Sequence, residues 1–103
     1  KITKKQSIKE FLLLKKLDSD VEKVLFMGYF LEKQEALECF NIEDIKNAYV
    51  NSKEAIPDNI NDKINMNIKK GLITEYPQKK DNKKAYHLTS TGEQVVETWS
   101  QNE

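Results

Sequence analysis

The sequence has no arginine, only one cysteine and only one histidine. With Cys39 alone, neither an intrachain disulfide nor a cysteine-cluster metal site can form. A metal ion at His87 would need carboxylates for its remaining ligands, so we expect no metal and no cofactor. No serine elbow or glycine-rich phosphate loop accompanies the neighbouring carboxylates of Glu35, Glu38, Glu43 and Asp44. The sequence therefore predicts a protein that is not an enzyme.

Long apolar runs are missing as well. The longest covers residues 11–14, far short of the roughly 20 residues that span a bilayer. No charged segment followed by an apolar one has the form of an export signal, so we expect a cytoplasmic protein without a membrane span. The opening residue Lys1 is consistent with a trimmed chain or with a piece of a longer protein.

Glycine and proline are scarce, at three and two residues, in a chain that is 38% apolar and 33% charged. This composition is typical of an ordered, helix-rich globular protein rather than a disordered one. A chain of 103 residues can bury about one core. We expect a single domain over residues 1–103, with an amino-terminal helix or arm at 1–17, a core at 18–92 and a carboxy-terminal helix at 93–103.

The apolar pattern predicts a mainly α fold with a small β-hairpin, an α+β domain. Apolar side chains recur three and four residues apart in several stretches, as on the buried face of a helix. Ser19 followed by Glu22 has the form of a capping box, and Asn41 followed by Asp44 caps another helix. Helices are expected at about residues 7–16, 19–33, 42–52, 57–70 and 91–100.

The fourth of these helices has the most regular pattern. Ile60, Ile64 and Ile68 recur at every fourth position, which predicts the face that this helix buries. Pro57 fits its first turn, where a missing N–H costs nothing. Gly71 fits its end, because glycine adopts the left-handed conformation without strain.

Two runs of β-branched and aromatic residues, 72–76 and 85–88, predict the strands of a hairpin. Eight polar residues join them. Residues 37–40 form either a short strand or an apolar hook. After the hairpin, Ser90 or Thr91 is expected to cap the last helix.

Positive charge is concentrated in one segment, although the chain is neutral overall. Residues 57–86 hold seven lysines against four acidic residues, a local balance of plus three. Lysine neutralises phosphate as a point charge, whereas the planar guanidinium group of arginine is the commonest reader of guanine. The segment is therefore better suited to contacts with a phosphate backbone than to reading G·C pairs. The nine asparagines and nine isoleucines also indicate an A·T-rich genome, which would itself account for the missing arginine.

Two motifs occur together around the hairpin. Residues 68–73 read IKKGLI at the end of the fourth helix, and residues 86–92 read YHLTSTG where the hairpin closes into the last helix. With the charged hairpin between them, they resemble the winged-helix superfamily of DNA-binding domains, especially regulators of the MarR and PadR types. The resemblance covers residues 19–100. The sequence departs from the usual pattern in having no arginine on the wing and in placing Asp58 and Asp62 on the recognition helix.

The resemblance implies that the fourth helix enters the major groove of double-stranded DNA and that the wing contacts the flanking backbone. With the isoleucines inward, a helical wheel puts Asp58, Lys63 and Asn65 on the flanks of the opposite, solvent side. The predicted recognition-helix contacts are Asn59, Asp62, Lys63, Met66, Lys69 and Lys70. The predicted wing contacts are Lys79, Lys80, Asn82, Lys83 and Lys84. Alternatively, the polar residues only solvate a helix, and the lysines only keep a hairpin tip from pairing with other strands.

Two functions follow from this pattern. The first is a non-enzymatic domain that binds double-stranded DNA, either as a transcription regulator or as the DNA-binding part of a larger protein. The alternative is a winged-helix module that holds a protein partner in a larger assembly, through the surface around Met66 or through the apolar first helix.

Apolar residues in the first two helices exceed what one buried face of each needs. In the first helix they are residues 11–14, and in the second they are Phe26, Met27 and Phe30. The surplus favours a homodimer formed through the first and last helices. In the other interpretation, these residues complete the core of a monomer around Trp99.

Overall fold

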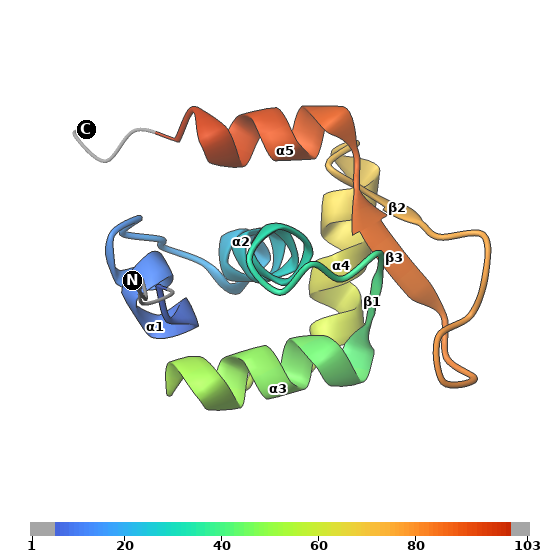
Figure 1. Cartoon of the computed structure of the whole chain (residues 1–103), viewed down its shortest axis with the longest axis horizontal. Helices are drawn as coiled ribbons and strands as arrows, with labels where there is room; N and C mark the ends of the chain where they lie inside the picture. The colour runs from blue at the N-terminus through green and yellow to red at the C-terminus, as the bar shows by residue number, and fades with distance from the viewer. Residues whose placement is uncertain (1–5, 100–103) are drawn as a thin grey trace, which may run out of the picture.

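The computed structural model describes residues 6–99, which form five helices and a three-stranded antiparallel sheet in one α+β body (Figure 1). In chain order the elements are α1 (Ile8–Leu13), α2 (Asp20–Lys33), β1 (Phe40–Asn41), α3 (Ile42–Ser52), α4 (Ile60–Lys69), β2 (Ile73–Glu75), β3 (Ala85–Leu88) and α5 (Ser90–Glu97). None of these helices has the length and apolar character needed to cross a membrane. Residues 1–5 and 100–103, which include the predicted arm and the predicted end of the last helix, lie outside the described residues.

Helix α2 forms the centre of the fold. Figure 1 looks nearly along its axis, with α1, α3, α4 and α5 arranged around it. Phe26 and Met27 are fully buried and Phe30 is 4% exposed, so the helix is covered on nearly every side. The interpretation of these three side chains as a surplus for dimerisation is therefore wrong. They are buried because α2 has neighbours all around it, whereas the sequence analysis assumed one buried face.

Helix α4 packs across α2 with its isoleucine side. Ile60 and Ile64 are 3% and 0% exposed, as predicted, but Ile68 is only half-buried. Asn67 is the third fully buried residue, and its side-chain Nδ2 donates to the carbonyl oxygens of Val21 and Lys63, both at 3.0 Å. The buried face is thus centred between the isoleucines and Asn67.

The start of α4 differs from the prediction. The helix begins at Ile60, with Asn59 as its N-cap, so Pro57 lies before the helix and not in its first turn. The Asn59 side chain accepts a hydrogen bond from the backbone N–H of Asp62 at 2.9 Å, and this local cap sets the first residue of the helix.

The sheet contains a strand that the predicted element order lacked. β1 pairs with β3, and the strand order is β1-β3-β2, with Phe40 opposite Tyr86 and Ile73 opposite Leu88. The segment at 37–40, left open between strand and hook, therefore ends in a strand that is two residues long. So short a strand exists only because β3 offers it an edge, and local sequence does not encode that.

A tight corner joins α4, the sheet and α5. Gly71 adopts the left-handed conformation, with φ of 78°, directly after α4. The hydroxyl of Thr89 donates to the carbonyl oxygen of Gly71 at 2.6 Å and accepts from the N–H of Gly92 at 2.9 Å. Thr89 is therefore the cap of α5, and the prediction of Ser90 or Thr91 is wrong. A side chain at Gly92 would collide with the carbonyl oxygen of Leu72, which explains glycine at this position.

The outer helices are shorter than predicted. α1 ends at Leu13 instead of residue 16, and α5 ends at Glu97. The two ends of the described chain are joined through Trp99, whose indole N–H donates to the carbonyl oxygen of Lys15 at 3.0 Å. The Trp99 ring also packs edge-on against Phe26, with 5.1 Å between centroids. Trp99 therefore ties the carboxy-terminal region to the core, as in the monomer interpretation.

Candidate nucleic-acid interface

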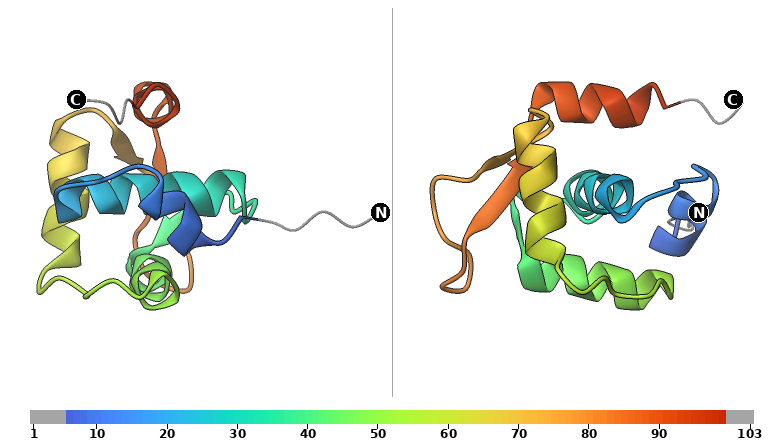
Figure 2. Two further views of the ribbon diagram at one scale, coloured as in Figure 1. Left: turned by 90° about the vertical axis from the view of Figure 1, so that its left-hand side faces the viewer. Right: turned by 180° about the vertical axis from the view of Figure 1, so that it is seen from behind.

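The outer face of α4 is a polar helix surface next to the hairpin. Seen from behind, α4 lies in front of α2 and the hairpin projects to one side of it (Figure 2). We define the outer face by the six exposed residues of the helix and its C-cap: Asn61, Asp62, Asn65, Met66, Lys69 and Lys70. Met66 is 39% exposed, so this face presents one apolar side chain among polar and charged ones.

Four of the six predicted recognition-helix residues lie on the outer face: Asp62, Met66, Lys69 and Lys70. The other two differ in role. The side-chain oxygen of Asn59 is engaged in capping α4. Lys63 is half-buried at the edge of the face, and its Nζ lies 3.8 Å from a carboxylate oxygen of Asp62.

Asn61 was not among the predicted contacts, and Asn65 was predicted only for the flank of the contact face. A signal for Asn61 was present, because Asn59 and Asp62 have the same spacing as the capping pair Asn41 and Asp44. Starting the helix at that cap, and centring its buried face on Asn67 as well as the isoleucines, turns both asparagines toward solvent.

The hairpin tip, residues 77–84, closes through a two-residue turn. Lys80 and Lys83 exchange backbone hydrogen bonds of 2.9 and 3.0 Å. Between them Asp81 and Asn82 have φ of 52° and 65°. Aspartate and asparagine tolerate this left-handed conformation better than most residues. The predicted contact Asn82 therefore has a turn-forming role that accounts for its presence.

Lys80 differs from the other lysines of the tip because it is bound to the body of the protein. Its Nζ lies 2.7 Å from a carboxylate oxygen of Asp44 and 3.4 Å from the carbonyl oxygen of Cys39. The side-chain amide of Asn41 donates to the Lys80 carbonyl oxygen at 3.1 Å. These contacts hold the tip against the start of α3. They also neutralise the Lys80 charge within the fold.

Five lysines of residues 57–86 take part in no ion pair within the described part of the chain: Lys69, Lys70, Lys79, Lys83 and Lys84. All five are exposed. Figure 1 shows the carboxyl end of α4 towards α5 and the hairpin tip level with α3. The carboxyl end of α4 and the hairpin tip therefore lie towards opposite ends of α4 in this view.

One hollow of the surface, of about 440 Å³, lies between the start of α1, the end of α2 and α3, with Ile8, Phe30 and Ala48 among its lining residues. Within residues 6–99 no group of three or more histidine, cysteine or acidic side chains is placed to hold a metal ion. His87 instead packs edge-on against Tyr76, with 5.2 Å between ring centroids.

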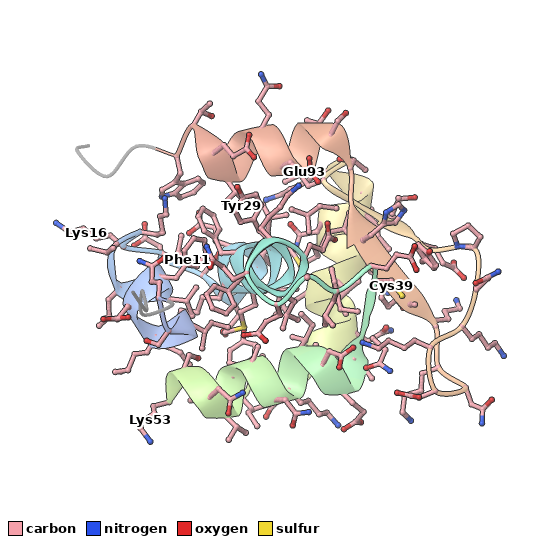
Figure 3. The ribbon with its side chains drawn as sticks, in the orientation of Figure 1. Phe11, Lys16, Tyr29, Cys39, Lys53 and Glu93 are labelled. Carbon is pink, nitrogen blue, oxygen red and sulfur yellow. The ribbon has the colours of Figure 1, made fainter. Side chains whose placement is uncertain are left out.

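Cys39 lies beside a smaller hollow under the hairpin, of about 340 Å³, and is labelled in Figure 3. The thiol is half-buried, and burial raises its pKa, with the carboxylates of Glu38 and Asp44 acting in the same direction. Lys80 acts in the opposite direction. A raised pKa disfavours the reactive thiolate.

Exposed apolar side chains occur away from α4, at the end of α1 and on α3. Leu13, Leu14 and Val50 are 62%, 56% and 60% exposed. Leu13 and Leu14 are what remains of the apolar surplus that favoured a dimer, since Phe11 and Leu12 are each only 7% exposed. Val50 was not part of that surplus.

In comparisons with known proteins, no family model, no curated protein and no solved structure matches this chain.

Proposed function

We propose that this chain is a non-enzymatic winged-helix domain that binds double-stranded DNA, with α4 at the major groove and the hairpin tip as the wing on the flanking backbone. It acts as a transcription regulator or as the DNA-binding part of a larger cytoplasmic protein. The order of α3, α4 and the hairpin supports this proposal. The position of β1 supports it as well. This short strand comes before α3 and α4 and pairs with β3, the second strand of the hairpin, and this pairing completes the outline of a winged helix.

The observation that carries the proposal is the distribution of unpaired lysines along α4. Its ten residues span about 15 Å, and the major groove is about 12 Å wide. A helix of this length that lies along the groove brings its two ends near the phosphates that line the groove. Lys69 and Lys70 at one end and the hairpin lysines beyond the other are placed to neutralise them, while the neutral middle of the outer face meets the bases.

Two features keep the expected affinity modest. Asp62 on the outer face repels phosphate, and Lys80 is already paired with Asp44. Five unpaired lysines remain, and each phosphate contact releases counterions on binding. The logarithm of the association constant should therefore fall with the logarithm of salt concentration with a slope of about −4 to −5.

Fluorescence anisotropy with a labelled 20-base-pair duplex, measured at several salt concentrations, tests the proposal. Replacing Lys69 and Lys70 together by alanine should weaken binding and reduce the size of the slope by about 2. A matched control replaces Lys16 and Lys53, which lie on the side of the molecule away from the hairpin (Figure 3), and should leave the slope unchanged. No change in anisotropy at tens of micromolar protein in the lowest salt would overturn the proposal.

The exposed leucines favour a second candidate, a protein-interaction module or homodimer that uses the end of α1. Leu13 and Leu14 are adjacent and together expose more apolar surface than isolated leucines do. Sedimentation over a range of concentrations tests this. A mass that rises with concentration in the wild type, and remains that of the monomer in Leu13→Ser, supports the dimer. A monomer at every concentration contradicts it.

A further inference from the structure

The asparagines among residues 6–99 differ in their roles. One group has roles inside the fold: Asn41 and Asn59 cap helices, and Asn67 is buried with two hydrogen bonds to carbonyl oxygens. In each case the carboxamide is engaged with backbone groups. These residues are accounted for by folding.

A second group is exposed on helices and holds Asn47 and Asn51 of α3 and, on the outer face of α4 beside the hairpin, the pair Asn61 and Asn65. Both are exposed on α4, and within the described residues neither side chain makes a hydrogen bond or ion pair. Asparagine is a poorer helix former than alanine, lysine or glutamate, because its side chain competes for backbone hydrogen bonds. Two such residues lower the stability of a ten-residue helix, and their side chains make no contact within the described residues that offsets the loss.

The two side chains are four residues apart, so they lie one above the other on the same side of α4. Four residues advance a helix by about 6 Å, and two base steps of one strand cover about 6.8 Å. A helix lying along the groove would therefore bring the two carboxamides to bases about two steps apart.

A carboxamide has one acceptor and one donor, which match adenine in the major groove. Adenine presents the N7 acceptor beside the N6 amino donor, whereas guanine presents two acceptors, N7 and O6. Guanine would leave the amide oxygen facing an acceptor. The chain also has no arginine, the usual partner of guanine. Next to Asn65, the thioether of Met66 can contact a thymine methyl group, although Asp62 on the same face would accept from cytosine N4.

Resting on the proposed function, we infer that Asn61 and Asn65 determine specificity by each bonding to an adenine, about two base steps apart, in the major groove of the bound duplex. The bases selected by this outer face are therefore adenines. The lysines, in contrast, bind any sequence.

Selection from a pool of duplexes with 12 random base pairs tests the inference. The wild type should enrich adenine at two positions about two steps apart. Asn61→Ala and Asn65→Ala should each lose the preference at one position and keep the other. Asn51→Ala, an exposed asparagine on α3, is the control and should enrich the same sequences as the wild type.

A modified base gives the sharper readout. Placing 7-deazaadenine, which lacks the N7 acceptor, at one selected position should weaken wild-type binding about 5- to 100-fold, the range expected for one bidentate contact. The asparagine variant for that position should show no further loss.

The two failures can be told apart. Binding that persists without an adenine preference, or a preference that survives in the double variant of Asn61 and Asn65, overturns this inference and leaves the proposed function standing. No recovery of duplex from the pool at any salt concentration overturns both. Thermal melts of the variants should show a stability equal to or slightly above that of the wild type, since both side chains are exposed and alanine is the better helix former.

Discussion

On its inner face α4 presents Ile60, Ile64 and Asn67, which are 0–3% exposed, and on its outer face it presents side chains that the rest of the chain barely touches. The inner face attaches the helix to α2, and the outer face contributes almost nothing to that attachment. Under the proposed function, this one ten-residue helix uses one side for folding and the other for recognition. Substitutions on the two faces should therefore have different effects, on stability for one and on binding for the other.

The largest expected effect is that of Ile64→Ala. Ile64 is fully buried, and removing its branched side chain leaves a cavity between α4 and α2. The free energy of unfolding should fall by about 2 to 5 kcal/mol. Denaturant melts measure this loss. A loss below 1 kcal/mol would mean that Ile64 lies on the exposed side of α4 and that the inner and outer faces are assigned the wrong way round.

Asn67→Leu should be the next most damaging change. Leucine keeps a similar volume but removes the hydrogen bonds to the carbonyl oxygens of Val21 and Lys63. We expect a loss of roughly 1 to 3 kcal/mol in the same melts. An unchanged or raised stability would show that the inner face needs only apolar packing and that the amide has no role in orienting α4.

The hairpin tip allows the comparison to be repeated with two lysines. Lys80→Met breaks the ion pair with Asp44, in which both side chains are about one-quarter exposed, and should lower stability by about 0.5 to 1 kcal/mol. Lys83→Met should leave stability unchanged, because Lys83 is exposed and unpaired.

DNA affinity should show the reverse order for these two variants. Lys83→Met should weaken binding at low salt and Lys80→Met much less, since the Lys80 charge is already neutralised in the fold. Denaturant melts give the stability of these two variants, and fluorescence anisotropy gives their affinity for DNA. Equal losses of affinity would mean that Lys80 leaves Asp44 when DNA binds.

Met66→Ala should have the smallest effect on stability. Met66 is 39% exposed on the outer face, and exposed substitutions usually change stability by less than about 0.5 kcal/mol. Measured beside Ile64→Ala, it provides a matched control on the same helix. A loss equal to that of Ile64→Ala would show that α4 is rotated about its axis relative to the structure.

Much of this arrangement is visible in local sequence. The four-residue repeat of isoleucine predicts the side of α4 that faces the core, and Asn41 with Asp44 predicts the start of α3 to the residue. These predictions hold because periodicity and capping depend on residues within about one helical turn. The strands of the hairpin were predictable for the same reason.

The rest depends on residues far apart in the chain. In the sequence, Lys80 cannot be distinguished from the unpaired lysines of the hairpin tip. Only the fold brings it to Asp44, which is 36 positions away. β1 exists only through pairing with β3. The position of α2 determines that Ile68 is half-buried and Asn67 fully buried. A helical wheel drawn for α4 alone gives no information about that position. The candidate site is therefore predictable in location and in type of residue, but not in which side chains remain free.

The most direct test is to map where a duplex touches the protein. Amide chemical shifts of the isotope-labelled chain, followed during titration with a 16-base-pair duplex at low salt, give that map residue by residue. The largest changes should occur at residues 61–70 and 79–84, with little change around Leu13 and Val50. Changes concentrated at Leu13 and Val50, or none at saturating DNA, would contradict the assignment of the outer face of α4 as the DNA-binding surface.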